Sequence, residues 1–162
     1  MIRVIAMAGG VIAFVLVGAS QVPSQVRLPV STVVPAAVVS QPFGCTPLVL
    51  EPVDLSCPSH HTHTGIDLAA PLGTEVHTAT SGTALTGFDP AGAGNFVEVR
   101  FDAGVRVLYC HLSAFAVRSG DQVVAGQLIG FVGATGLATG PHVHLQVDVD
   151  GVPVDPAVYL AS

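Results

Sequence analysis

Two histidines stand two positions apart near the end of the chain, His142 and His144 in the segment GPHVHLQV. Side chains alternate along a β-strand, so both imidazoles would point to one face, roughly 6–7 Å apart along the backbone. Val143, Leu145 and Val147 would point to the other face, into a core. Neighbouring imidazoles pack poorly on a sheet surface, but they suit a metal ion and a reacting water. The pair therefore indicates a candidate site, although a chance pair explains it equally well when it is taken alone.

A second candidate is the pair His63 and Asp67 in HTHTGIDLAAP. An imidazole nitrogen and a carboxylate oxygen are both common zinc ligands. The spacing would also fit one helical turn, but the intervening Thr64, Gly65 and Ile66 disfavour a helix. We therefore expect Asp67 on a strand and His63 at its entrance. The alternative for so short a motif is a turn residue beside a surface histidine.

A third histidine, His111, lies in VRVLYCHLS beside a cysteine. On a strand, His111 would share a face with Val107 and Tyr109, whereas Cys110 would point to the opposite face. This arrangement favours a structural role for the Cys110 thiol over a Cys–His nucleophile. The other histidines fit none of these arrangements, and we expect them to be exposed or to play at most a supporting role: His60, His61 and His77.

The elements that must position these residues are short strands. From about residue 41, apolar runs alternate with Gly, Pro, Asp and Asn breaks every eight to twelve residues, which is typical of an all-β sandwich or barrel. The triplet Asp102, Ala103 and Gly104 suits a hairpin turn. No segment shows a convincing helical period over three turns. The candidate strands are 64–68, 75–79, 82–87, 96–101, 105–112, 122–124, 128–132 and 142–149.

The composition narrows the class of protein. A length of 162 residues suggests one domain, and the high glycine and proline content suits strands and tight turns. The net charge is −6 and the five basic residues are scattered arginines, so nucleic-acid binding is not expected. The segment SGDQVVAGQLIG is similar to the half-barrels of biotinyl and lipoyl carrier domains. Those domains need a lysine, and this chain has none.

The beginning of the chain predicts export. Residues 1–19 hold one arginine and an apolar run that is short for a membrane span, which needs roughly 20 residues. Val17 and Ala19 fit the −3 and −1 positions of a signal-peptide cleavage site. An uncleaved anchor is the alternative, and either would place the protein outside the cell or in its envelope. Residues 20–40 read as a Pro-rich linker, and residues 41–160 as the domain.

An exported protein sits where disulfides persist, which gives meaning to the three cysteines. Cys45 and Cys57 are close in sequence and could staple a loop, which would leave Cys110 as the odd thiol. The alternative is that all three are small buried residues. A cysteine zinc site is not expected, because no CxxC spacing occurs.

Together and in this order, the three histidine motifs resemble those of the lysostaphin-type zinc endopeptidases, the family that includes LytM. The family pattern is HxxxD, then a lone histidine before Leu-Ser, then HxH, and all three parts are present. The flanks match as well: HTGIDLAAPLGTEV, YCHLS, SGDQVVAGQLIGFVGATGLATGPHVHLQV and GVPVDPAVYL. The resemblance covers about residues 41–160.

The resemblance implies a function for each motif. It implies that His63, Asp67 and His144 bind Zn²⁺ and that His111 and His142 form the catalytic pair. It also implies an all-β fold, a small twisted antiparallel sheet core (the duplicated hybrid motif, similar to a barrel-sandwich) with long loops forming a groove. The implied substrate is the peptide cross-link or cross-bridge of bacterial peptidoglycan.

The chain departs from the family pattern at a few positions, none of which removes a site residue. Val143 and Gln146 stand where family members often carry Leu and Glu, and Cys110 stands where Ala is common. A cysteine-bounded loop precedes His63. This loop bears on substrate preference. Which bond is cut therefore stays open, and a glycine bridge and a D-Ala–diaminopimelate link are the two candidates.

Three protein ligands would leave a fourth zinc position for water, which is the arrangement of a catalytic site. Either His111 or His142 would exchange the proton and the other would hold the oxyanion. Because the two histidine ligands and His142 must be neutral imidazoles, we expect activity to fall below pH ~6. A non-catalytic peptidoglycan-binding or activator module and a carboxypeptidase are the alternatives, and a monomer is the default.

Overall fold

The computed structural model describes residues 26–161. The predicted signal segment, residues 1–19, and the first part of the predicted linker lie outside this range. Within the described range, no helix has the length and apolar character that a membrane crossing requires.

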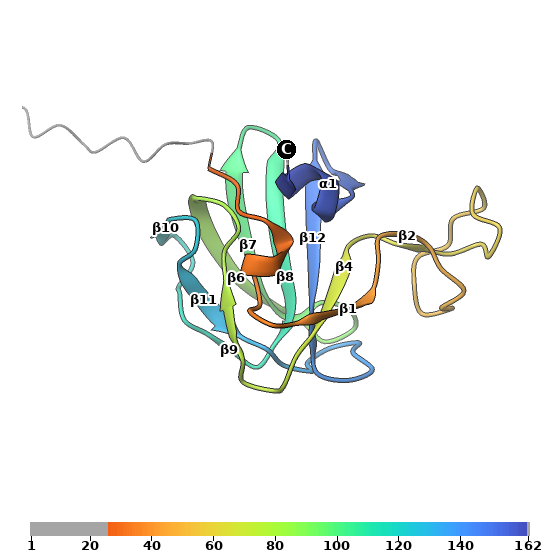
Figure 1. Ribbon diagram of the computed structural model, residues 1–162, viewed down its shortest axis with the longest axis horizontal. Coiled ribbons are helices and arrows are strands. Elements are labelled where there is room, and N and C mark those ends of the chain that lie inside the picture. The colour runs from red at the N-terminus through yellow and green to blue at the C-terminus, as the bar shows by residue number, and fades with distance from the viewer. Residues whose placement is uncertain (1–25, 162) are drawn as a thin grey trace, which may run out of the picture.

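The regular secondary structure of the described chain is almost entirely antiparallel β-strand, which confirms the predicted fold class (Figure 1). The main sheet runs in the order β1-β4-β12-β8-β7-β6-β10, and β13 pairs with β12. Its strands are β1 (Val38–Gln41), β4 (Ile66–Ala69), β6 (Gly82–Asp89), β7 (Gly94–Asp102), β8 (Val105–Leu112), β10 (Gln122–Val123), β12 (His142–Val149) and β13 (Val152–Val154).

Two smaller sheets and two short helices complete the fold. One sheet has the order β5-β11-β9, from β5 (Glu75–His77), β11 (Leu128–Phe131) and β9 (Ala114–Phe115), and the other pairs β2 (Gly44–Cys45) with β3 (Thr62–His63). The helices are η1 (Val30–Thr32) and α1 (Pro156–Ala161).

The long strands agree with the sequence prediction. The predicted strands 105–112 and 142–149 coincide with β8 and β12, and the predicted turn at 102–104 joins β7 to β8, with Gly104 at φ 77°. The other predicted strands differ by a few residues at their ends.

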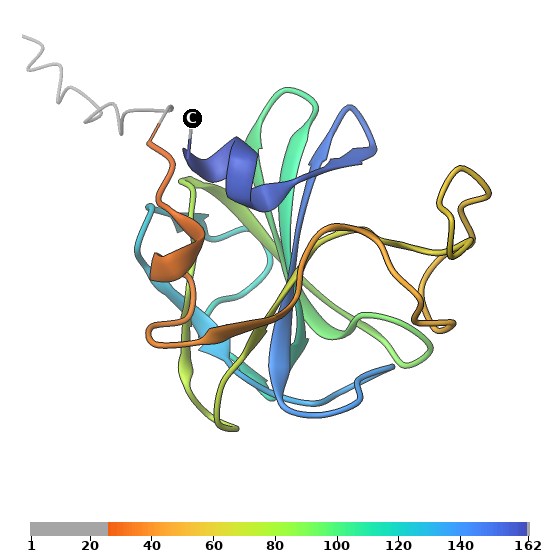
Figure 2. The same ribbon diagram turned by 45° about the vertical axis from the view of Figure 1, so that its right-hand side comes forward.

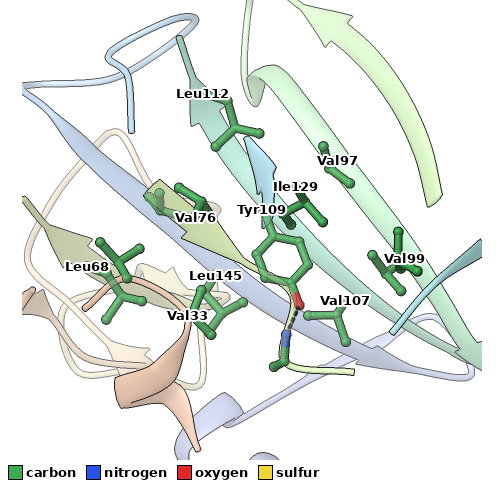
Figure 3. Close-up of a cluster of buried hydrophobic side chains, with 14 of the residues drawn as sticks. Val33, Leu68, Val76, Val97, Val99, Val107, Tyr109, Leu112, Ile129 and Leu145 are labelled. Carbon is green, nitrogen blue, oxygen red and sulfur yellow. Dashed lines mark hydrogen bonds between the residues drawn. The ribbon is translucent and has the colours of Figure 1, made fainter. Parts of the chain in front are cut away.

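The core joins the main sheet to the three-stranded sheet (Figure 3). Val76 and Ile129 come from the small sheet and are fully buried, as is Tyr109 from β8. The Tyr109 hydroxyl accepts a hydrogen bond from the backbone N–H of Ala79 at 2.8 Å. The apolar alternation expected along β12 is confirmed, because three alternate residues have no exposed surface: Val143, Leu145 and Val147.

The described part of the expected linker packs against the domain. Val33 and Val34 are buried in the core, and the Val33 carbonyl accepts a hydrogen bond from the His77 N–H at 2.8 Å. β1 then pairs with β4 at the edge of the main sheet. The segment has no regular apolar period, so its sequence gives no sign of this packing.

The predicted disulfide between Cys45 and Cys57 is present, and Cys110 is a buried free cysteine. The loop that the disulfide closes extends away from the sheets beyond β2 (Figure 2). The backbone N–H of Asp54 donates to the His60 carbonyl and that of Thr62 to the Pro52 carbonyl, and these bonds join the loop to the segment that follows it.

Candidate active site

Three of the predicted residues converge where β4, β12 and β3 meet. Asp67 on β4 and His144 on β12 are directly opposite in the strand register, and His63 ends β3. Asp67 Oδ1 lies 3.1 Å from His63 Nε2 and 3.0 Å from His144 Nδ1, and the two imidazole nitrogens are 2.9 Å apart. The structure therefore brings together the three residues expected to bind metal.

Hydrogen bonds on the far side of each ring fix which nitrogen faces this cluster. His63 Nδ1 lies 2.9 Å from the Pro42 carbonyl, which can only accept, so Nδ1 carries the hydrogen and Nε2 keeps its lone pair. His144 Nε2 donates in the same way to Gln146 Oε1 at 3.3 Å, which leaves the Nδ1 lone pair in the cluster. Three acceptor atoms thus face one another.

Such a set of acceptors fits a metal ion. All three ligand atoms lie within 4.8 Å of one another. A tetrahedral ion with bonds of about 2.0–2.2 Å would separate its ligands by roughly 3.4 Å, so shifts of a few tenths of an ångström would seat it. Two imidazoles and a carboxylate are donors that divalent transition metals accept.

The same residues carry opposed pKa shifts. Burial alone would raise the pKa of Asp67, but the hydrogen bonds that protonated His144 and His63 would donate to it, together with their charge, lower it well below its ordinary value. Burial would lower the pKa of His63, yet the Asp67 hydrogen bond, the Pro42 carbonyl and the charges of Asp67 and Glu51 raise it. The cluster is therefore an anionic pocket that suits a cation, either a proton or a metal ion.

A second pair of imidazoles, His111 and His142, lies beside the cluster with ring centroids 4.7 Å apart. His111 Nδ1 donates to the Thr135 carbonyl at 2.9 Å, and His142 Nδ1 donates to the Gly140 carbonyl at 2.8 Å. Both rings therefore keep the Nε2 lone pair for the site. His142 Nε2 is 3.7 Å from Asp67 Oδ1, which places this pair next to the cluster.

The pKa of His111 is lowered to about 4. Burial is the largest cause, and the positive charges of His142 and His144 act in the same direction, while the Thr135 carbonyl and Asp67 oppose them. His111 thus remains a neutral proton acceptor through the weakly acidic range.

The position of His111 depends on a β-bulge that the sequence did not reveal. Asn95 pairs with Leu112 and Val97 with Tyr109, so two residues of β8 oppose one of β7. His111 has φ 64°, in the left-handed region. This backbone turn brings the His111 side chain to the face of β8 that faces the groove.

The bulge corrects the prediction for Cys110. Cys110 pairs directly with His144 and lines the same groove as His111, so the expectation that it points to the opposite face is wrong. Strict alternation of side chains fails at the bulge, because two residues of β8 stand there opposite a single residue of β7. Burial, helped by the charge of Asp67, raises the pKa of the thiol to about 12, so it stays protonated.

The remaining histidines lie apart from the cluster. His60 is exposed, His61 Nδ1 bonds the Glu51 carbonyl at 2.8 Å, and His77 lies 3.5 Å from Glu75. The sequence did not single out the residues that hold the rings. These are the backbone carbonyls of Pro42, Thr135 and Gly140. Every residue type has a backbone carbonyl, so the sequence gives no sign of this role.

Four of the five site residues line a groove of about 580 Å³, namely Asp67, His111, His142 and His144, whereas His63 is buried behind it. The disulfide-bounded loop contributes an apolar wall and one carboxylate, Glu51, whose Oε1 lies 4.0 Å from His63 Nε2. The exposed Leu137 contributes on another side. A groove of this size, with apolar walls and a few converging polar groups, is typical of a ligand-binding site. The apolar loop residues are Leu48, Leu50, Pro52 and Val53.

A family model described as peptidase family M23 matches residues 61–156, more than half of the chain. The chain belongs to peptidase family M23. This confirms the family predicted from the motifs, since lysostaphin is among the relatives of this M23 chain. The match spans all five predicted site residues.

Individual M23 relatives are similar over the same part of the chain. The DD-carboxypeptidase/endopeptidase Mpg of Neisseria meningitidis is 48% identical over 94 residues, which are 58% of this chain and 22% of the relative. The chain thus spans about a fifth of the length of the curated relatives it matches.

Solved structures agree with the M23 assignment. The catalytic domain of lysostaphin from Staphylococcus simulans has a TM-score of 0.64 at 32% identity, covering 78% of this chain and 93% of that domain. A zinc-containing peptidase from Vibrio cholerae has a TM-score of 0.64 at 30% identity, covering 75% of this chain and 36% of that one.

Proposed function

We propose that this chain is a zinc-dependent endopeptidase that hydrolyses peptide cross-links or cross-bridges of bacterial peptidoglycan. One observation carries the proposal: three acceptor atoms of His63, Asp67 and His144 converge beside His111 and His142, whose Nδ1 atoms are bound to backbone carbonyls and whose Nε2 atoms keep their lone pairs. The relatives named DD-endopeptidases and lysostaphin support the substrate class.

In this proposal His63, Asp67 and His144 hold the metal ion. Zinc, when bound, would supply a Lewis acid that polarises the scissile carbonyl and lowers the pKa of water. The protein contributes three fixed lone pairs, so no rearrangement of rings precedes binding. The Asp67 carboxylate offsets part of the cationic charge.

The histidine pair moves the proton. A water in the groove gives a proton to His111 Nε2 while its oxygen attacks the peptide carbon, and the proton then passes to the departing amine as the C–N bond breaks. His111 suits this step because it remains neutral at working pH. His142 presents its Nε2 from the neighbouring strand and orients the reacting groups.

The test compares zinc content and wall hydrolysis for the purified chain, His144→Ala and the matched control His60→Ala. About one zinc per chain and release of cleaved muropeptides are expected for wild type and for His60→Ala, because His60 is exposed and outside the cluster. Both should be lost in His144→Ala. Absence of zinc from the wild-type protein would overturn the ligand assignment.

The substrates used in that test also separate two activities. The relative named DD-carboxypeptidase/endopeptidase makes a carboxypeptidase reading the second candidate. Cross-linked dimers with D-Ala–diaminopimelate links, glycine-bridged dimers and uncross-linked pentapeptides should be offered in parallel. Cleavage of either dimer supports the endopeptidase, whereas release of D-Ala alone supports the carboxypeptidase. Zinc binding without any cleavage would favour a binding or activator module.

Export completes the proposal. We expect residues 1–19 to direct secretion and to be removed, leaving a monomer in the cell envelope or outside the cell, with residues 41–160 as the catalytic domain. Mass spectrometry of the exported protein would test this by reporting its first residue. A chain that keeps Met1 and stays with the membrane would instead indicate an anchor.

A further inference from the structure

A row of polar side chains runs away from the metal cluster along one face of the main sheet. Gln146 and Asp148 follow His144 at alternate positions of β12 and therefore share its face. Arg106 on the neighbouring β8 is the register partner of Asp148. None of these residues was singled out for the reaction, yet they connect to His144 by hydrogen bonds.

The direction of each hydrogen bond in this row follows from its far end. Arg106 can only donate, and its Nε and Nη2 lie 2.8 Å and 2.7 Å from Asp148 Oδ2. The other Asp148 oxygen, Oδ1, lies 2.7 Å from the Gln146 side chain. A carboxylate only accepts, so the amide NH₂ of Gln146 must face Asp148.

The amide oxygen of Gln146 must then face the other way. It accepts from the Thr64 hydroxyl at 2.7 Å and from His144 Nε2 at 3.3 Å. The hydrogen on His144 is thereby held on Nε2, and the Nδ1 lone pair stays directed at Asp67 and His63. A reversed amide would place NH₂ against His144 Nε2 and favour the wrong tautomer.

Burial restricts the Asp148 part of the row. Asp148 is 1% exposed and its charge is compensated by Arg106, which also reaches Glu98 at 3.3 Å. A buried carboxylate without these partners would be costly, so Asp148 keeps both hydrogen bonds. Gln146 therefore has one favoured amide orientation.

We propose that Gln146, oriented by Asp148 and Arg106, is a positioning residue that fixes the His144 tautomer and so sets metal affinity. The proposal rests on the metal site of the proposed function. Outer partners of ligating histidines commonly change metal affinity by about 10- to 100-fold when they are removed. A purely structural role for the row would instead alter stability without changing the His144 tautomer.

The first measurement is the tautomer of His144 in the metal-free protein, read from ¹⁵N imidazole shifts above the ordinary imidazole pKa of about 6.5. Wild type should show hydrogen on Nε2. Gln146→Leu, which removes the acceptor at similar size, should show a mixture of tautomers. An unchanged His144 spectrum in Gln146→Leu would overturn the proposal, and this readout depends on neither zinc nor turnover.

The second measurement is zinc affinity by competition with a chromophoric chelator. Gln146→Leu should bind zinc about 10- to 100-fold more weakly than wild type. The double variant Gln146→Glu with Asp148→Asn exchanges carboxylate and amide, so an acceptor still faces His144 and Arg106 still meets an oxygen. It should bind within about threefold of wild type. A double variant as weak as Gln146→Leu would contradict the proposal.

A matched control separates positioning from folding. Arg100→Gln removes an arginine that pairs with Glu98 at 2.8 Å, at the far end of the same row. It should leave both the tautomer and the zinc affinity unchanged. The thermal unfolding of each metal-free variant identifies any variant that fails to fold. If Gln146→Leu is one of these, the zinc affinity of the double variant tests the proposal.

Discussion

The site has two halves, the cluster of His63, Asp67 and His144 and the pair of His111 and His142. Each half contains two histidines, but their surroundings give the two pairs opposite properties. His63 and His144 share the Asp67 carboxylate, which raises the pKa of His63 and makes that half a candidate cation site. His111 and His142 are instead held by backbone carbonyls, and the pKa of His111 is lowered. Every ring turns a lone pair inward, so the Asp67 carboxylate distinguishes the half that suits a positive ion from the half that contains the neutral His111.

Removing the carboxylate should have the largest effect. Asp67→Asn takes away the anionic ligand and is expected to abolish zinc retention and to lower peptidoglycan hydrolysis by at least about 10³-fold, since several kcal/mol of charge stabilisation are lost. Zinc content and muropeptide release measure the two effects. Activity with a full complement of zinc would erase the distinction between the halves.

Replacing His111, the proposed proton acceptor, should lower hydrolysis without lowering zinc content. His111→Ala is expected to keep zinc, because His111 lies outside the ligand cluster, while hydrolysis falls by about 10²- to 10⁴-fold. The same two assays apply, with His61→Ala as a control on a histidine outside the cluster, whose side chain bonds the Glu51 carbonyl. Loss of zinc in His111→Ala would show that the pair shares the metal.

Acid should act on the metal half first. The raised pKa of His63 means that, in the metal-free protein, its proton stabilises the fold at low pH, and this contribution is lost as pH rises through the raised value. Protons therefore compete with the metal at and above the ordinary imidazole pKa of about 6.5. His111, with a pKa near 4, favours the folded state above about 6.5, and this stabilisation is lost as pH falls toward 4.

Below pH ~6.5 we therefore expect zinc content and activity to fall together, and excess zinc to restore activity toward pH 5. Parallel pH profiles of both quantities check this. Activity that disappears while zinc remains bound would place the limiting protonation on the histidine pair.

Opening the disulfide should affect substrate more than metal. Cys45 and Cys57 are 12 positions apart, and closing a loop of that size contributes up to about 3 kcal/mol to the free energy of unfolding. Because the loop lines the groove, Cys45→Ser with Cys57→Ser should raise KM by roughly 3- to 10-fold with kcat and zinc content nearly unchanged. A fall in zinc content instead would tie the loop, through Glu51, to the metal half.

The smallest effect is expected at Cys110, which lies between the halves. Its thiol stays protonated, so Cys110→Ala should keep zinc content and hydrolysis within about twofold of wild type. The wild-type thiol should also resist alkylation at pH 8 in the folded protein. Rapid alkylation with loss of activity would give this thiol a role that its burial argues against.

The sequence predicted what depends on regular alternation. β8 and β12 were located to the residue, and the inward Val143, Leu145 and Val147 follow from period two. Strands of two or three residues, such as β2 and β9, are too short to show any period. They exist because neighbouring chain segments supply their hydrogen-bond partners.

The candidate site was predictable as a set of residues but not as a geometry. The motif resemblance named five residues that the structure brings together, although their roles remain predictions. The bulge at Cys110 and His111 could not be predicted from the sequence, because no residue type in YCHL indicates that β8 has an extra residue relative to β7. The polar row through Gln146 was equally hidden, since its order depends on pairing across strands.

The segment of residues 26–40, which packs against the predicted domain, has a practical consequence for the design of shortened recombinant versions. A recombinant version beginning at residue 41 would lack nearly all of β1 and both core valines, Val33 and Val34. The edge of β4 would then present unpaired backbone groups to other molecules, a known route to edge-to-edge aggregation. Expression trials should therefore start no later than Val26, and poor solubility of a shorter version would say nothing about the enzyme.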